Sequence, residues 1–461
     1  MSVPSNIFKT YDIRGIVGKE LNPELVESIG KAFGTYLLER GTTETVVGRD
    51  SRSTSDEYSE ILIKGITSTG CNVVDIGMTV SSGVYFTMRE KKITGGIMVT
   101  ASHNPAEYNG FKMCHGLHAI AEDEIQKVRK IIESGEFRTG KGNVRIDDMN
   151  KVYFGKIAEK VKLEKKLKVV VDCGNATPGA FIPQFLEHLG CEVIPLYCDL
   201  DSAYPNHIPD PVHLDAYKDL IKKVKENKAD VGILLDGDGD RVGFVDHTGN
   251  IHLGDTILTL FVREIIPKNP GRKVIVELKD SEVVVEETKR LGGIPIFWKT
   301  GHALLDKKIH EEDAILCGEM SCHYWVIDDW YSFDDSIYAM ARMLRMISKK
   351  PLSDLVGELP KYPVTPEYRI RCPEERKEEL VEAFVKHSKE HCTKVIDVDG
   401  VRAYIHDGWF LMRKSNTQPL VSVRCEARTN EGLEKIKEFV KNKMDQYDFV
   451  ELDWDKPYAH A

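Results

Sequence analysis

Short apolar runs and amphipathic segments alternate along most of the chain. Residues 22–41, NPELVESIGKAFGTYLLERG, carry apolar side chains at helical spacing, with Asn22 as a cap at one end and Gly41 at the other. The segments TVVGRDSR (45–52) and CNVVDIG (71–77) instead predict buried strands, and the first of these strands ends in a charged turn. This order of strand, helix and strand predicts parallel sheets flanked by helices.

The same strand–turn–helix pattern begins again twice. KVVVDCGNATPGAFIPQFLEHLG (168–190) and KVIVELKDSEVVVEETKRLGG (273–293) both follow it, and LPKYPVTPEYRIRCPEER (359–376) has the proline content of a linker. We therefore predict an α/β protein of four domains: three related mixed α/β sheet domains with flanking helices, and a smaller C-terminal α+β domain. The predicted boundaries give domains of 1–150, 151–255, 256–365 and 366–461.

Composition narrows the class of protein. The chain has 461 residues and a formal net charge of -10, which argues against a general nucleic-acid binder because such a protein carries a basic face. Its 10 cysteines form no C-x-x-C pair, so zinc ribbons and redox dithiols are not expected. The start MSVPSNIFKT lacks the pattern of a secretory leader, and no apolar run approaches the ~20 residues of a membrane span. We expect free thiols, a cytoplasmic location, and neither nucleic acid nor membrane as a partner.

The stretch GIMVTASHNPAEYNGFK (96–112) predicts a buried strand that ends abruptly in polar residues. Ser102, His103 and Asn104 follow the apolar run and are closed off by Pro105. Serine and asparagine are good turn formers, and proline cannot continue a strand, so an ordinary turn is one interpretation. The other is a rigid strand that holds a nucleophilic hydroxyl at its carboxyl end, where open α/β sheets bind their ligands.

The stretch VGILLDGDGDRVGFVD (231–246) predicts two apolar strands around an acidic loop. Three aspartates alternate with glycines in this loop: Asp236, Asp238 and Asp240. Carboxylates this close repel one another unless a cation neutralises them, and oxygen ligands suit Mg²⁺ or a similar hard cation. An EF-hand is excluded, because Arg241 stands where that loop needs Gly and His247 where it needs Glu. The alternative is a hairpin loop that is merely exposed to water.

Four further stretches have weaker signals. CGEMSCH (317–323) offers Glu319, Ser321 and His323, which suit hydrogen bonds to sugar hydroxyls but equally form an ordinary polar turn. The others offer cations and hydroxyls beside polar turns: LMRKSNTQPLVSVRCEA (411–427) with Arg413, Lys414, Ser415, Asn416 and Thr417, KTGHALL (299–305) with Lys299 and His302, and FKTYDIRG (8–15) with Lys9, Tyr11 and Arg14. The first of these three matches the needs of a phosphate group, although a basic surface turn has the same composition.

Together these stretches supply a hydroxyl nucleophile, a hard-metal loop, a hydroxyl-binding group and a phosphate-binding loop, which suits phosphoryl transfer on a phosphorylated sugar. The motifs TASHNP, DGDGDR, GEMSCH and RKSNTQP also occur in the order and spacing of the α-D-phosphohexomutase superfamily. From about Phe8 to Glu426 the chain resembles the phosphomannomutase/phosphoglucomutase branch of that superfamily, whose four domains surround a central cleft.

The resemblance implies a role for each matching position. Ser102 would be the phosphorylated serine, and it would hold one Mg²⁺ ion together with Asp236, Asp238 and Asp240. The other residues of the implied catalytic group are His103, Lys112, His302 and Arg241. The implied substrate-binding residues are Tyr11, Arg14, Lys279, Gly301, Glu319, Ser321, His323, Arg413, Ser415, Asn416 and Thr417. Cys322 is a departure, because relatives often have Gly or Ala there.

The implied reaction interconverts hexose 1-phosphate and hexose 6-phosphate of mannose, glucose or both. It passes through a phosphoserine and a hexose 1,6-bisphosphate, with glucose 1,6-bisphosphate as activator. The enzyme would be an isomerase with a small phosphosugar as its partner, and a monomer or homodimer. A phosphoglucosamine mutase is the nearest alternative, because glucosamine phosphate shares the O3 and O4 hydroxyls. An inactive phosphosugar-binding protein is the non-enzymatic alternative, although such a chain would be expected to lose the serine or an aspartate that this one keeps.

Overall fold

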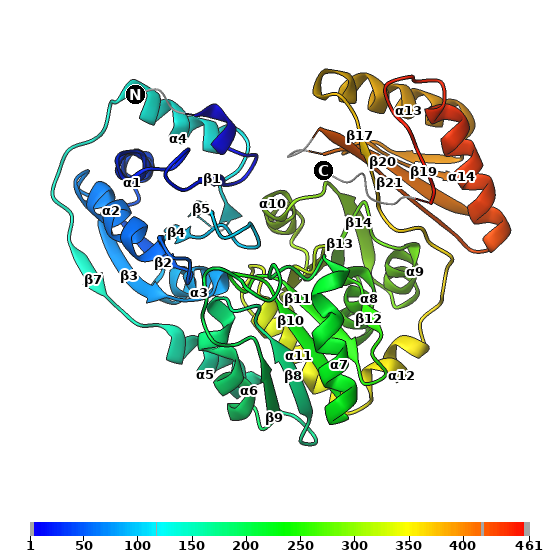
Figure 1. The fold of residues 1–461 in the computed structure, drawn as a ribbon, viewed down its shortest axis with the longest axis horizontal. Helices are drawn as coiled ribbons and strands as arrows, with labels where there is room; N and C mark the ends of the chain where they lie inside the picture. Colours follow the sequence, from blue (N-terminus) through cyan, green and yellow to red (C-terminus); the bar gives the residue numbers. More distant parts are fainter. Residues whose placement is uncertain (1–3, 117, 416–418, 456–461) are drawn as a thin grey trace. The chain divides into compact units, whose positions relative to one another are not determined.

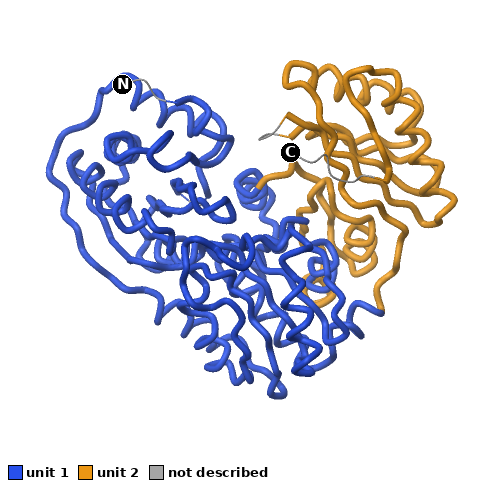
Figure 2. Tube along the Cα trace, viewed as in Figure 1, with its two compact units in different colours: residues 1–261, 302–357 blue, residues 262–301, 358–461 orange. Residues whose placement is uncertain are grey.

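The computed structural model describes residues 4–116, 118–415 and 419–455. These residues divide into two compact units (Figure 2). Unit 1 contains the residues up to Phe261 and His302–Gly357, and unit 2 contains Val262–Gly301 and the residues from Glu358 onward. Residues of the predicted third domain, 256–365, are present in both units, and the predicted boundaries stay predictions.

Unit 1 begins with a seven-stranded sheet in the order β1-β5-β4-β2-β3-β7, with β6 paired to β5 (Figure 1). Strands β4, β2, β3 and β7 run parallel to one another, while β5 is antiparallel to both β4 and β1. The strands are β1 (Ile13–Ile16), β2 (Glu44–Arg49), β3 (Asn72–Met78), β4 (Gly95–Val99), β5 (Tyr108–His115), β6 (His118–Ala119) and β7 (Val144–Ile146). The helices of this part are η1 (Ser5–Ile7), α1 (Pro23–Leu38), α2 (Ser55–Thr67), α3 (Ser81–Lys91), α4 (Asp123–Ser134) and α5 (Asn150–Lys160).

The first helix, α1, shows how the sequence determines these elements. The side chain of Asn22 accepts a hydrogen bond from the backbone N–H of Leu25 at 2.9 Å, and Pro23 occupies the first helical position. Gly41, at φ +77°, follows the helix end as predicted. At Gly30 the helix approaches α2 so closely that a Cβ atom would lie 2.4 Å from the carbonyl oxygen of Leu62. The helix predicted from its apolar spacing is confirmed.

The second sheet of unit 1 has the order β12-β11-β10-β8-β9. Strands β8, β9 and β10 run parallel, and β10 and β11 form an antiparallel hairpin whose strands are buried throughout. The elements are β8 (Lys168–Asp172), η2 (Thr177–Ala180), α6 (Ile182–His188), β9 (Glu192–Leu196), η3 (Leu214–Tyr217), α7 (Lys218–Asn227), β10 (Val231–Leu235), β11 (Val242–Asp246) and β12 (Ile251–His252). The hairpin therefore fixes both ends of the acidic loop.

The remaining part of unit 1 contains an antiparallel strand pair and three helices. They are α10 (His302–Glu312), β15 (Leu316–Gly318), β16 (Tyr324–Val326), α11 (Ser336–Ile347) and α12 (Leu352–Gly357). Helix α8 (Gly254–Ile265) contains the boundary between the units. The motif CGEMSCH joins β15 to β16, so the predicted polar turn is the connection of a short hairpin.

Unit 2 contains a parallel strand pair and a five-stranded antiparallel sheet in the order β17-β21-β20-β19-β18. Its elements are η4 (Ile266–Lys268), β13 (Lys273–Glu277), α9 (Glu282–Arg290), β14 (Ile294–Trp298), β17 (Tyr368–Arg371), η5 (Glu374–Arg376), α13 (Lys377–His391), β18 (Lys394–Ile396), β19 (Val401–Ile405), β20 (Gly408–Lys414), β21 (Leu420–Ala427) and α14 (Asn430–Met444). The five-stranded sheet and helices α13 and α14 share one apolar core that includes Phe384, Phe410 and Ile436. This is the smaller α+β domain that the sequence predicts.

Among the described residues, no helix is both long and apolar enough to cross a bilayer. The ten cysteines are free thiols, as predicted, and most of them are buried.

Candidate functional site

The predicted serine loop follows β4 directly. Ser102 is buried, with 1% of its surface exposed, and its backbone has φ +52°. A positive φ is uncommon for a residue with a side chain and often marks a functional position. The hydroxyl of Thr100 accepts a hydrogen bond from the backbone N–H of Ser102 at 2.8 Å. The loop therefore holds Ser102 in a fixed, unusual conformation at the carboxyl end of a central strand.

The acidic loop between β10 and β11 contacts this serine. The Ser102 hydroxyl donates a hydrogen bond to Asp236 Oδ2 at 2.7 Å. Asp236 Oδ1 accepts from the backbone N–H groups of Asp240 and Arg241, at 3.0 and 3.1 Å, which closes the loop on itself. A Cβ atom on Gly237 would lie 2.2 Å from the carbonyl oxygen of Ser102, so only glycine permits this approach. The structure thus brings together two motifs that are 134 residues apart in the chain.

Three buried carboxylates converge in the acidic loop. Asp236, Asp238 and Asp240 each offer an oxygen within 4.8 Å of the others, and all are at most 2% exposed. Lys112, from β5, lies 2.6 Å from Asp238 Oδ2 and also pairs with Asp240. Burial and the neighbouring Asp240 and Asp238 charges raise the pKa of Asp236 well above its usual value. Burial acts in the same direction on Asp240, but Lys112 and His323 outweigh it and hold the pKa of Asp240 well below its usual value.

This donor set fits a hard cation. Asp238 Oδ1 is buried and has no hydrogen-bond partner among the residues that the structure describes. A buried carboxylate oxygen without a partner is costly, and oxygen-only ligand groups are typical of Mg²⁺ and Ca²⁺ sites. The three aspartates are therefore a candidate carboxylate metal site.

The β15–β16 connection places three predicted sugar-binding residues beside the acidic loop. His323 Nε2 lies 3.3 Å from Asp240 Oδ1, and His323 Nδ1 lies 2.9 Å from Glu319 Oε2. The Ser321 hydroxyl lies 3.2 Å from Glu319 Oε2 and 3.0 Å from His323 Nδ1. Glu319 and His323 are buried and Ser321 is half-buried, so these residues form a polar cluster that continues inward from the aspartates, unlike a turn at the surface.

Cys322, the departure noted in the sequence, has φ +72° in this connection. This is the left-handed region, which favours glycine. The carbonyl oxygen of Cys322 accepts a hydrogen bond from the backbone N–H of Val242 at 3.1 Å, which ties the connection to β11. The thiol itself is buried, and burial raises its pKa to about 12, so it stays protonated and unreactive.

His302 begins α10, as predicted, and faces a carboxylate that sequence reasoning missed. His302 Nε2 lies 2.8 Å from Asp334 Oδ2, and the imidazoles of His302 and His323 have their centres 5.2 Å apart. Burial alone would lower the pKa of His302, but the Asp334 and Asp240 charges raise it to about 9. His302 is therefore a protonated imidazole at neutral pH, held in place by Asp334.

The remaining cations predicted in unit 1 lie around the same loops. Arg14, in β1, donates to Asp12 Oδ2 at 2.7 Å and to Asn104 Oδ1 at 2.5 Å. Arg241 Nη1 donates to Asp210 Oδ1 at 3.2 Å. Burial lowers the pKa of His103 well below its usual value, and the neighbouring Arg241 and Arg14 charges lower it further.

His103 is therefore a neutral imidazole, with Nδ1 3.1 Å from the Ser102 hydroxyl. Tyr11 is also close to these charges: burial and Asp12 raise the pKa of its hydroxyl. The His103 imidazole and the Tyr11 hydroxyl are therefore both uncharged at neutral pH and can form hydrogen bonds.

Unit 2 holds the other predicted substrate-binding residues. Arg413, near the end of β20, pairs with Asp399 at 3.0 Å, and Asp399 also accepts from the backbone N–H of Thr300 at 3.2 Å, next to Gly301. Lys279 lies 3.2 Å from Glu277 Oε1. The backbone N–H of Ser415 donates a hydrogen bond to the carbonyl oxygen of Leu420 at 2.9 Å. Asn416 and Thr417 lie outside the described residues.

Arg52 is the residue of this site that sequence reasoning missed most clearly. Its buried guanidinium donates to carbonyl oxygens across the whole serine loop, those of Ser102, Asn104, Pro105 and Tyr108, at 2.5 to 2.9 Å. Asp50 lies 3.4 Å away and balances its charge. The only sequence signal was the charged end of the predicted strand TVVGRDSR. Arg52 is thus a positioning residue for the serine loop.

We predict that Arg52→Ala lowers kcat at least about tenfold while changing KM less, because the loop loses charge-assisted hydrogen bonds of about 1.5–3 kcal/mol each. Steady-state kinetics on the purified variants would measure this split. Arg49→Ala is the matched control, because Arg49 lies only three residues before Arg52 but makes an ion pair with the exposed Asp56. Equal kinetics for Arg52→Ala and Arg49→Ala would show that Arg52 does not position Ser102.

Comparisons with known proteins identify the fold and the family of the chain. Four family models match in succession: the phosphoglucomutase/phosphomannomutase alpha/beta/alpha domains I, II and III at residues 5–139, 151–249 and 253–362, and the C-terminal domain at 367–443. Together they confirm the predicted four-domain α/β fold.

Individual relatives cover almost the whole chain. A phosphomannomutase/phosphoglucomutase of Pseudomonas aeruginosa is 40% identical over 97% of this chain and 97% of its own. A phosphoglucomutase of Neisseria meningitidis is 38% identical over 94% and 96% of the two chains. A solved structure of a phosphoglucomutase/phosphomannomutase family protein from Burkholderia thailandensis has a TM-score of 0.92 at 36% identity, covering 96% of this chain and 98% of that one. The chain belongs to the phosphoglucomutase/phosphomannomutase family of the α-D-phosphohexomutase superfamily.

Proposed function

We propose that this chain is a hexose-phosphate mutase that interconverts hexose 1-phosphate and hexose 6-phosphate of mannose and glucose, with Ser102 as the phosphoryl carrier. The observation that carries the proposal is the contact between the Ser102 hydroxyl and Asp236, at 2.7 Å, in a buried group of three aspartates. A serine held in this way can accept a phosphoryl group next to a bound cation, which offsets the charge of the transferring group.

The reaction has two phosphoryl transfers. In the first, the bond between the phosphorus and the Ser102 oxygen breaks while a bond to the free sugar hydroxyl forms, giving a hexose 1,6-bisphosphate. The sugar then turns, and its other phosphate returns to the Ser102 oxygen. Neutral His103, with Nδ1 3.1 Å from this oxygen, can accept the Ser102 hydroxyl proton as the oxygen attacks in the second transfer. The imidazolium formed in this way can then return that proton to the Ser102 oxygen when the oxygen leaves in the first transfer of the next cycle.

Lys112 and His302 are the proposed proton-transfer groups on the sugar side. Both have raised pKa values and are charged in the substrate-free protein, so either can donate a proton to a departing sugar oxygen. The charge of Lys112 is maintained by Asp238 and Asp240 against the effect of burial. Neutralising these carboxylates would lower its pKa and allow Lys112 to accept the proton of an attacking hydroxyl.

The proposed resident cation is one Mg²⁺ per chain, held by Asp236, Asp238, Asp240 and one oxygen of phosphorylated Ser102. When bound, it would offset the negative charge of the transferring phosphoryl group. Glucose 1,6-bisphosphate is the proposed activator, because it can phosphorylate Ser102. Arg413 and Ser415, with Asn416 and Thr417, are proposed to hold the phosphate that does not react. A cytoplasmic location and a monomer or homodimer stay predictions.

The proposed sugar contacts predict dual specificity. Glu319 and Ser321 would bind the O3 and O4 hydroxyls, whereas glucose and mannose differ only at C2. Strong discrimination requires a polar contact at the differing atom, so kcat/KM for the two sugars should differ little. Kinetics with glucose 1-phosphate, mannose 1-phosphate and glucosamine 1-phosphate would test this, and a large preference for the amino sugar would identify a phosphoglucosamine mutase instead.

Intact-mass measurement separates an active mutase from an inactive phosphosugar-binding protein. After incubation with glucose 1,6-bisphosphate and Mg²⁺, the protein should gain the mass of one phosphoryl group, located at Ser102 by peptide mapping. A mutase uses a phosphorylated carrier in every cycle, while a binding protein has no need of one. A protein that binds the bisphosphate but never gains this mass would be non-catalytic.

A further inference from the structure

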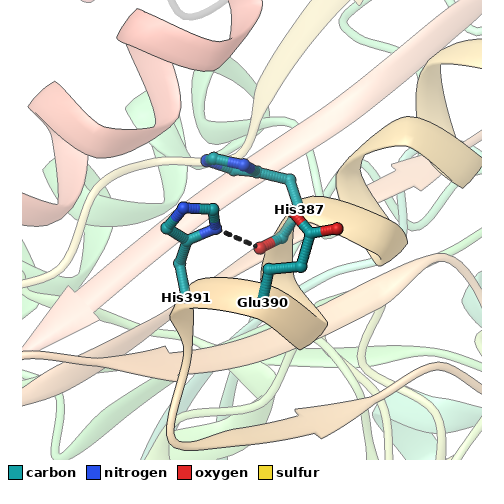
Figure 3. A group of neighbouring side chains, drawn as sticks. All are labelled: His387, Glu390 and His391. Carbon is teal, nitrogen blue, oxygen red and sulfur yellow. Dashed lines mark hydrogen bonds between the residues drawn. The ribbon is translucent and has the colours of Figure 1, made fainter.

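A group of metal-ligating side chains in unit 2 takes no part in the proposed mutase chemistry. His387, Glu390 and His391 lie in the last two turns of α13, and each offers one ligand atom within 4.8 Å of the others. Figure 3 shows the three side chains gathered at the end of this helix. Residues three and four apart share one face of a helix, so the backbone itself sets this arrangement.

Hydrogen bonding prepares His391 to be a ligand. Its Nδ1 lies 2.8 Å from the carbonyl oxygen of His387, the dashed contact in Figure 3. A carbonyl oxygen only accepts, so Nδ1 carries the proton and Nε2 of the neutral ring keeps its lone pair. Metal-ligating histidines commonly have this second hydrogen bond, which fixes both tautomer and ring orientation.

Packing holds His387 in a matching position. Its ring stacks on Phe439 of α14, with the ring centres 5.0 Å apart and the planes 20° from parallel. The two imidazole centres are 4.2 Å apart. Both rings are thus held before any ion binds, which reduces the conformational entropy lost on binding. Glu390 and His391 are exposed and His387 is half-buried, so an ion can enter from solvent.

The charge and the donor types favour a transition metal. The carboxyl end of a helix carries partial negative charge and favours cations, and Glu390 adds a full negative charge. Imidazole suits Zn²⁺, Cu²⁺ and Ni²⁺, whereas Mg²⁺ prefers oxygen ligands. We propose that His387, Glu390 and His391 form a Zn²⁺-type transition-metal site, distinct in ligand chemistry from the aspartate group of unit 1.

Calorimetric titration of the untagged full-length protein with ZnCl₂ tests this proposal. Mg²⁺ is kept in large excess, so that the aspartates are not left free for Zn²⁺. The wild type should bind one Zn²⁺ more than the double variant His387→Ala/His391→Ala. Single His391→Ala and Glu390→Gln variants should each bind Zn²⁺ at least about tenfold more weakly. Even the loss of a group that only hydrogen-bonds to a metal ligand lowers metal affinity by about 10–100-fold.

His188→Ala is the matched control, because His188 is a lone exposed histidine at the end of α6. It should bind Zn²⁺ as the wild type does, and mutase activity should be unchanged in all four variants, which confirms that they fold. Equal Zn²⁺ stoichiometry and affinity in the wild type and the double variant would overturn the site. Unchanged affinity in Glu390→Gln would overturn the assignment of three ligands.

Discussion

Replacing Ser102 by alanine should abolish mutase turnover while leaving sugar-phosphate binding largely intact. The change removes only one oxygen, which is the atom proposed to carry the phosphoryl group. Among the described residues, the other groups in contact with Asp236 are backbone N–H groups, so no second hydroxyl there could take the place of Ser102. We expect kcat to fall by about four orders of magnitude or more, as when the nucleophile of other enzymes is removed. A coupled assay of glucose 1-phosphate conversion measures this loss, and calorimetry measures the retained binding.

Ser59→Ala is the control for this experiment. Ser59 is also buried in unit 1, and its hydroxyl only donates to a backbone carbonyl within α2, so its loss should leave kcat within a factor of a few. Ser102→Ala should also gain no phosphoryl mass from glucose 1,6-bisphosphate. Turnover near the wild-type rate in this variant would require another nucleophile and would refute the assigned role of Ser102.

Local sequence patterns predicted the elements and the loops of the site, because both depend on neighbouring residues. Asn22 and Pro23 define the start of α1, and the DGDGDR motif lies between two apolar runs that form the β10–β11 hairpin. Since the carboxyl ends of parallel strands lie along the ligand-binding edge of such sheets, Ser102 and the aspartates were expected near ligands. Their direct contact was implied only by the family resemblance.

The partners that balance the site's charges could not be predicted in this way. Asp334 lies 32 residues after His302, Asp210 lies 31 before Arg241, and Arg52 lies 50 before the carbonyl it binds at Ser102. Nothing in the local sequence distinguishes these residues from the many surface charges of a chain that is 30% charged. They become recognisable only when folding buries them, because a buried charge requires a partner. The conformation of Cys322 could not be predicted either, because cysteine does not favour a positive φ and the φ of this residue is set by the β15–β16 connection.

Lys112→Met should destabilise the metal-free protein and make its stability strongly dependent on Mg²⁺. Lys112 is 11% exposed and pairs with two buried carboxylates, Asp238 and Asp240. Removing one partner of a buried ion pair costs about 3–5 kcal/mol, because the remaining charge is left uncompensated. Loss of the proposed proton-transfer group should also lower kcat by about 10²–10⁴-fold. Thermal unfolding with EDTA, compared with the wild type, measures the destabilisation.

Magnesium should restore much of the stability that Lys112→Met loses, since a divalent cation among the aspartates replaces the missing positive charge. A ligand at about 100 times its Kd stabilises the native state by about 2.7 kcal/mol, and binding should tighten when no ammonium group competes for Asp238 and Asp240. The rise in Tm on adding Mg²⁺ should therefore be larger for Lys112→Met than for the wild type. Lys64→Met is the control: Lys64 is 73% exposed and pairs with Glu27 on the surface, so its Tm should respond to Mg²⁺ as the wild type does. An equal Mg²⁺ response in Lys112→Met and wild type would mean that the ammonium group and the cation do not share the same carboxylates.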